Sequence, residues 1–127
     1  MSKTLLPPLA VLLAMFAFAL QNGRYMGAET DRWQTQLHKA EVFAWAEDWE
    51  SAAETLQDSY RDWTSRQVYL HIVTEHDVVD DAESMYQRAM AFAAVQEDSE
   101  FRAELADLRT QLQLLAEMER FSLKNIL

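Results

Sequence analysis

The chain has 127 residues with 21 acidic and 11 basic side chains, a formal net charge of -10 and no cysteine, which suits one compact domain. Both glycines and both prolines lie within the first 27 residues. This composition excludes disulfides, thiolate metal sites and cysteine-linked lipids, as well as the glycine-rich loops that cradle phosphates.

The N-terminal segment predicts a membrane helix. Residues 4–23 carry no charge and are apolar for most of their length, and about 20 apolar residues span a bilayer core as a helix. Lys3 favours a cytoplasmic N-terminus and an extracytoplasmic body. We expect a single-pass anchor over residues 1–24 and an extracytoplasmic helical domain over residues 25–127. A signal peptide cleaved after Ala19 and a buried soluble helix are the alternatives.

The body of the chain is strongly acidic. Residues 31–127 contain 20 acidic and 9 basic side chains and so carry a charge of -11. Phosphate backbones attract clustered Lys and Arg, and this segment has no such cluster, so nucleic acid is excluded as an expected partner. The charge mainly keeps the domain in solution.

Four apolar patterns with helical spacing follow along the chain. The first, from Trp33 to Ala44, is short for a bundle helix, so we expect the N-terminal helix to continue into it. The other three step alternately by four and three residues. The second pattern contains Trp49, Ala53, Leu56, Tyr60, Trp63, Gln67 and Leu70. The third contains Val78, Ala82, Met85, Ala89 and Phe92, and the fourth contains Phe101, Leu105, Leu108, Leu112 and Leu115.

The connections between these patterns are short. Breaks near Ala46, Thr74 and Glu97 make neighbouring helices antiparallel, and Asp48 is a suitable N-cap after the first break. The predicted fold is all-α, with an N-terminal transmembrane helix continuing into an up-down antiparallel bundle of about four helices. We interpret the shared spacing as a packing period and expect no internal sequence repeat.

The densest group of possible metal ligands is His71, Glu75 and His76. Imidazole and carboxylate groups ligate zinc or iron and exchange protons. The spacing matches neither the His-Glu-x-x-His zinc motif nor the Glu-x-x-His pairs of di-iron bundles. A turn that caps two helices is the simpler interpretation, so we expect no catalytic residue, metal or cofactor.

Apolar side chains at the two ends of the bundle are candidate partner contacts. Trp45 lies by the first turn, far from the expected membrane, with packing under that turn as the alternative. Phe121, Ile126 and Leu127 come back toward the bilayer at the end of the last helix.

Several residues occur in a recognisable order after the short apolar segment. They are Asp48-Trp49, Trp63, His71, Asp77 and the closing Ser122-Leu123-Lys124-Asn125-Ile126-Leu127. From Lys3 to Leu127 the chain thus resembles a bacterial family of small membrane-anchored helical proteins, domain of unknown function 4363. The resemblance implies an anchored, extracytoplasmic helical domain and supplies no catalytic residue.

The leading hypothesis is a non-catalytic, membrane-anchored helical module that binds or stabilises another membrane or cell-envelope protein. It follows from complete packing seams without a convergent polar site. One alternative is a metal-binding bundle that uses His71, Glu75 and His76. The other is a self-associating structural protein, a homo-oligomer, because heptad seams also build intermolecular bundles.

Overall fold

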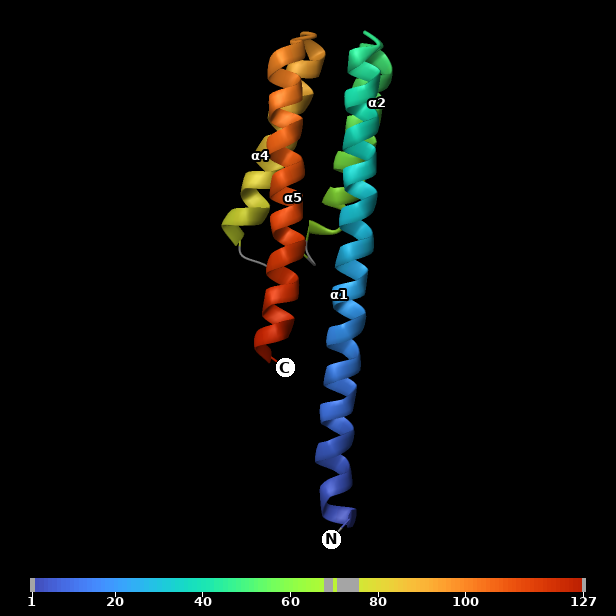
Figure 1. Cartoon of the computed structure of the whole chain (residues 1–127), viewed down its shortest axis with the longest axis vertical. Helices are drawn as coiled ribbons and strands as arrows, with labels where there is room; N and C mark the ends of the chain where they lie inside the picture. The colour runs from blue at the N-terminus through green and yellow to red at the C-terminus, as the bar shows by residue number, and fades with distance from the viewer. Residues whose placement is uncertain (1, 68–69, 71–75, 127) are drawn as a thin grey trace.

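The computed structural model is a bundle of long helices whose axes run nearly parallel to one another (Figure 1). It describes residues 2–67, 70 and 76–126, and the side chains of residues 7–18, 28–67, 70 and 76–118. The helices with described bounds are α1 (Ser2–Trp45), α2 (Trp49–Thr64), α4 (His76–Ala94) and α5 (Asp98–Ile126). The predicted all-α class is confirmed.

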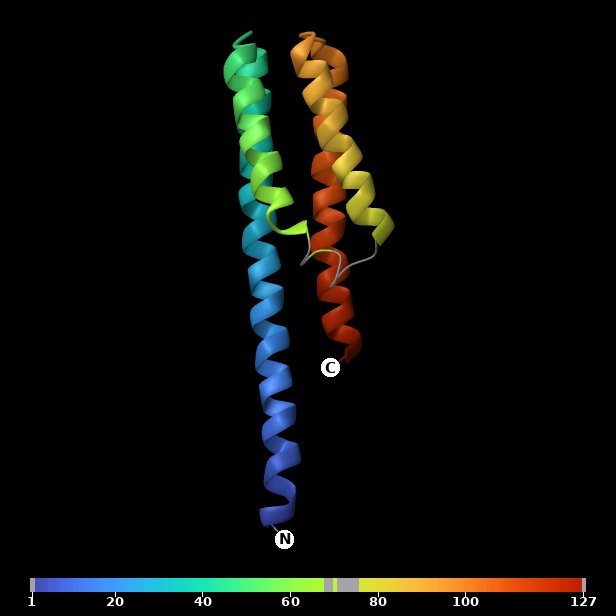
Figure 2. The same ribbon diagram turned by 180° about the vertical axis from the view of Figure 1, so that it is seen from behind.

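The helices form two hairpins that pack side by side. Helix α1 contacts α2 and α5, and α4 contacts α5 and α2, so the four close a ring around one core. Figures 1 and 2 show that the α1–α2 turn and the α4–α5 turn lie at the same end of the bundle. We name this end, residues 45–48 and 95–98, the distal tip.

The prediction of a transmembrane helix over residues 4–23 is wrong. Across the described part of the chain, no helix combines the length and the apolar character that a bilayer crossing needs. Helix α1 instead runs without a break into the bundle, and its first part extends beyond the end of α5 (Figure 1).

Both turns of the distal tip have the same backbone geometry. In the first, the Asp48 N–H donates to the Phe43 carbonyl at 2.9 Å and the Glu47 N–H donates to the Ala44 carbonyl at 3.0 Å. Glu47 has a left-handed φ of 59°, as the C′ residue of this helix-ending motif requires. Asp48 then caps α2, because its side chain accepts a bond from the Ser51 N–H at 3.2 Å.

The second turn repeats this pattern 49 residues later. The Glu97 N–H donates to the Phe92 carbonyl and the Gln96 N–H to the Ala93 carbonyl. Gln96 has a φ of 57°, close to that of Glu47. The two helical hairpins therefore end in equivalent turns.

The buried positions repeat with the same offset. In the first hairpin they are Thr30, Trp33, Leu37, Ala40, Ala44, Ala52, Leu56, Ser59 and Trp63. The residues 49 positions later are also buried: Val79, Ala82, Tyr86, Ala89, Ala93, Phe101, Leu105, Leu108 and Leu112. From the sequence we expected no internal repeat. The repeat of buried positions was not recognised, because most equivalent positions hold different residues. Trp33 corresponds to Ala82 and Ala52 to Phe101, so large and small side chains exchange places.

The apolar lines predicted from the sequence match the buried residues more closely in some helices than in others. The five apolar residues from Phe101 to Leu115 are all buried. In α4 the buried line runs through Val79 and Tyr86, whereas Val78 and Met85 are only partly buried. Helix α2 ends at Thr64, before the predicted end of its seam.

Candidate functional site

The distal tip exposes two large apolar side chains. Trp45 is 54% exposed and Val95 is 67% exposed. The guanidinium carbon of Arg102 lies 5.5 Å from the centre of a Trp45 ring, within the range of a cation–π contact. Arg102 pairs with Asp98 through two hydrogen bonds. Its Nε donates to Asp98 Oδ1 at 2.9 Å, and its Nη2 donates to Asp98 Oδ2. One face of the indole therefore carries a guanidinium group that is itself paired with Asp98.

An aromatic contact joins the two hairpins just inside the tip. The rings of Trp49 on α2 and Phe101 on α5 meet edge to face, with centroids 5.3 Å apart. Phe101 is fully buried. This contact keeps the two turns beside each other.

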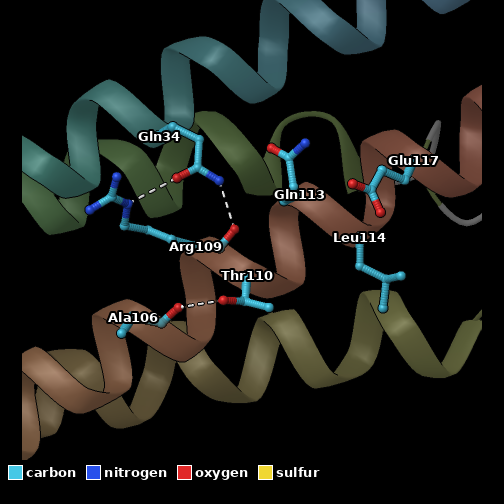
Figure 3. A pocket seen from close by; sticks show the side chains of 7 residues that line it. All are labelled: Gln34, Ala106, Arg109, Thr110, Gln113, Leu114 and Glu117. Atoms are coloured by element: carbon cyan, nitrogen blue, oxygen red, sulfur yellow. Dashed lines mark hydrogen bonds between the residues drawn. The ribbon is translucent and has the colours of Figure 1, made fainter.

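A shallow groove lies between α1 and α5. It is lined by Gln34, Ala106, Arg109, Thr110, Gln113, Leu114 and Glu117. Figure 3 shows Gln34 and Arg109 facing each other: Arg109 Nε donates to Gln34 Oε1 at 3.0 Å, and Gln34 Nε2 donates to the Arg109 carbonyl at 2.6 Å. This reciprocal pair joins two helices, and Arg109 Nη1 also lies 3.7 Å from Glu41 Oε2, so the polar residues of the groove hold α1 against α5.

Ion pairs link α1 to α2 at the other end of the first hairpin. Arg32 Nε donates to Asp62 Oδ2 at 2.6 Å, and Arg32 also pairs with Glu29, whose side chain is 8% exposed. Arg66 Nε lies 3.6 Å from the same Glu29 carboxylate. The nearly buried carboxylate is thus compensated by two guanidinium groups, as a buried charge requires.

A polar and aromatic cluster fills the seam between α2 and α4. The hydroxyls of Ser59 and Tyr86 are 2.9 Å apart and fully buried, and the Tyr86 ring lies 5.4 Å from that of Trp63. Tyr60 donates to Glu83 at 2.5 Å and accepts from Gln87.

Both tyrosines of this cluster are harder to ionise than usual. Burial raises the pKa of Tyr86, with the Ser59 hydrogen bond acting in the opposite direction. The hydrogen bond to Glu83, followed by burial, raises the pKa of Tyr60. Near neutral pH both tyrosine side chains are therefore uncharged, and their hydroxyls form hydrogen bonds between α2 and α4.

The predicted metal candidates are not brought together among the described residues. His76 is the first residue of α4, and its Nε2 lies 3.1 Å from Asp80 Oδ2, one helical turn away. His71 and Glu75 lie outside the described residues. Within residues 2–67, 70 and 76–126, no three His, Asp or Glu side chains form a group that could hold a metal ion.

The predicted contact residues lie at opposite ends of the bundle. Trp45 is exposed at the distal tip, and the alternative of packing under the turn does not hold. Phe121 and Ile126 lie in the last part of α5, but their side chains are outside the described set, as is Leu127 altogether.

The start of α1 carries an exposed apolar surface that we name the apolar arm, residues 9–18. Its large side chains range from 44% to 72% exposed. They are Leu9, Val11, Leu12, Leu13, Met15, Phe16 and Phe18. At 100° per residue these positions surround most of the helix, which leaves little of it polar.

The model of one family, described as a domain of unknown function (DUF4363), matches residues 21–126. The chain belongs to this family. Comparison with curated proteins and with solved structures gave no match. In this DUF4363 protein the matched range contains the distal tip, helices α2, α4 and α5 and the part of α1 from residue 21 onward, whereas the apolar arm precedes it.

Sequence reasoning missed the residues that fix the tip and the α1–α5 seam. Neither Arg102 nor Arg109 is among the contact residues predicted from the sequence. The structure places Arg102 on Trp45 and Arg109 on Gln34. The spacing of Asp98 and Arg102, four residues apart on one helix, is the one available signal for the ion pair.

Proposed function

We propose that this protein is a non-catalytic helical module that binds a membrane or cell-envelope protein through its apolar arm. The observation that carries the proposal is the exposure of the arm, where Phe18 is 72% and Leu12 is 63% exposed. A helix that is apolar on nearly all sides is normally buried, and contiguous exposed apolar surface marks interaction sites.

The rest of the described molecule supports a binding role. The interior is filled by side chains from all four helices, with Trp33, Trp63, Tyr86 and Phe101 the largest that are fully buried. The groove between α1 and α5 is open, and its Gln34–Arg109 pair is already satisfied. Among the described side chains, the arm is the longest run of exposed large apolar residues, and covering it by a partner would be favourable.

Membrane and envelope proteins are the partner class we propose because they expose apolar helices. A helical arm offers them side-chain packing along its length. The alternative is that the arms of two copies pack together, which would make the protein a self-associating structural element.

Site-specific photo-crosslinking in native cells tests the proposal. A benzophenone amino acid at Leu12 should give a discrete adduct with a membrane or envelope protein, identified by mass spectrometry. The same group at Leu114, an exposed leucine of α5, is the matched control and should not give that adduct. Adducts with a second copy alone would favour self-association, and the absence of any Leu12-specific adduct would also contradict the proposal.

A polar substitution gives a second measurement. Leu12→Asn should reduce co-purification of the crosslinked partner by about tenfold, because it removes apolar area from the contact. Leu114→Asn should leave recovery unchanged. Circular dichroism of both variants should match the unmodified protein, because Leu12 and Leu114 are both exposed.

A further inference from the structure

The two turns of the distal tip have the same backbone but different side chains, so comparing them shows which side chains the turn needs. Trp45 occupies the position that Ala94 holds in the second hairpin, and Val95 corresponds to Ala46 in the first. The backbone hydrogen bonds and left-handed φ values are the same in both turns. Alanine therefore satisfies the turn at either position, and folding of the turn does not require the exposed indole or the exposed valine.

The side-chain charge is mostly negative at the tip and in the first turns of α2 and α5 that follow it. Residues 45–50 and 95–102 contain six carboxylates and one basic side chain, that of Arg102. Helix starts explain some of these acids, since Asp48 caps α2 and Glu100 lies in the first turn of α5. Glu47 has no such role: it occupies a left-handed position that glycine fits best, and it is exposed.

Arg102 shows which kind of group fits this surface. Its guanidinium lies over the Trp45 ring and pairs with Asp98 at the same time. An aromatic face bordered by carboxylates attracts cations through the ring quadrupole and through Coulomb forces.

We propose that the distal tip binds a basic segment of a partner protein, in which a lysine or arginine takes the place of Arg102 over Trp45. The apolar Val95 contacts the aliphatic part of the same segment. The six carboxylates complement its charge and repel acidic partners. This surface lies at the opposite end of the bundle from the apolar arm (Figure 1), so the inference is independent of the proposed function.

Fluorescence anisotropy with a defined probe tests the inference on the full chain. The probe is a fluorescein-labelled peptide of alternating arginine and leucine, and the control is the same peptide with glutamate in place of arginine. The arginine peptide should bind at least tenfold more tightly than the glutamate peptide. Its affinity should fall at least threefold between 50 and 300 mM salt, because exposed charges are screened. Equal binding of the two peptides, or binding insensitive to salt, would overturn the inference.

Three variants locate the site. Trp45→Ala, which copies the second turn, should weaken binding at least tenfold, whereas Leu114→Ala should not change it. Arg102→Ala should bind as tightly as the unmodified protein or more tightly, because it uncovers the indole face and removes a positive charge. Retained affinity in Trp45→Ala, or loss of binding in Arg102→Ala, would contradict the proposal that a basic side chain of the partner replaces Arg102 over Trp45. All three side chains are exposed enough for the variants to fold, which circular dichroism checks.

Discussion

The α1–α2 and α4–α5 hairpins share a backbone plan but differ in what they bury. Thr30, Trp33, Ser59 and Trp63 of the first hairpin correspond to Val79, Ala82, Leu108 and Leu112 of the second. The indole N–H groups of Trp33 and Trp63 and the Thr30 hydroxyl are buried without a hydrogen-bond partner. The comparison shows that the spacing of buried positions determines the hairpin, while the chemistry at each position is free to vary.

The difference has an energetic consequence. A buried polar group without a partner costs about 1–3 kcal/mol, so the first hairpin gains less from its core than its aromatic bulk implies. The second hairpin buries Phe101, Leu105, Leu108 and Leu112 with no such penalty at the equivalent positions. The Trp63–Tyr86 contact then ties the two hairpins together.

The largest effect is expected from truncating equivalent core residues. Trp63→Ala should destabilise the fold by about 3–5 kcal/mol, because it leaves a cavity and removes the ring contacts with Tyr60 and Tyr86. Leu112→Ala should cost about 2–4 kcal/mol. Urea unfolding followed by circular dichroism measures both, and a larger loss for Leu112→Ala would contradict the importance of the aromatic contact between hairpins.

An intermediate effect is expected from the buried hydroxyl pair. Ser59→Ala or Tyr86→Phe alone should cost about 1–3 kcal/mol, because each leaves the other hydroxyl buried without a partner. The double variant should be less destabilised than the sum of the two, since neither hydroxyl of the pair is then left buried without its partner. Strict additivity in a double-mutant cycle would show that the two hydroxyls do not interact.

Stability should also fall in alkaline solution. The pKa values of Tyr60 and Tyr86 are raised in the folded protein, whereas an unfolded tyrosine ionises near pH 10. The folded state therefore keeps protons that the unfolded chain releases. The contribution of the neutral phenols is complete below about pH 10 and is lost as the pH rises through the folded pKa values.

Urea unfolding between pH 8 and pH 11 measures this loss. Tyr86→Phe should lose less stability over that range, relative to its own value at pH 8. An unchanged pH dependence in Tyr86→Phe would mean that Tyr86 does not contribute to it.

The smallest effect is expected at the two turns. Glu47→Gly and Gln96→Gly should each stabilise the fold by about 0.5–1 kcal/mol, because glycine adopts the left-handed conformation without a steric penalty. Similar gains at both positions would strengthen the equivalence of the hairpins. A gain at one turn and a loss at the other, by thermal unfolding, would contradict it.

Sequence periodicity predicted the buried face correctly in the helix whose apolar stripe is narrow. The line from Phe101 to Leu115 was predicted and is buried throughout. In α4 the stripe is wide, and only packing against α2 and α5 decides that Val79 rather than Val78 lies at its centre. The end of α2 at Thr64 was not predicted, because Ser65 and Arg66 are compatible with a continuing helix.

The internal repeat and the surface pairs could not be read from one sequence. Identical residues remain at only a few equivalent core positions, such as Ala40 with Ala89 and Leu56 with Leu105. The Gln34–Arg109 pair joins residues 75 positions apart, and its partners become neighbours only after the helices pack. The exposed position of Trp45 was one of two predicted alternatives.

The unbroken course of α1 fixes the distance between its two ends. From Phe18 to Trp45 the helix rises by about 40 Å, at about 1.5 Å per residue, with hydrogen bonds continuous over the whole distance. Two proteins attached at its ends would be kept at a set separation and in a set rotational phase. Inserting two residues into α1 would turn one attachment by roughly 200° relative to the other while lengthening the spacer by only about 3 Å.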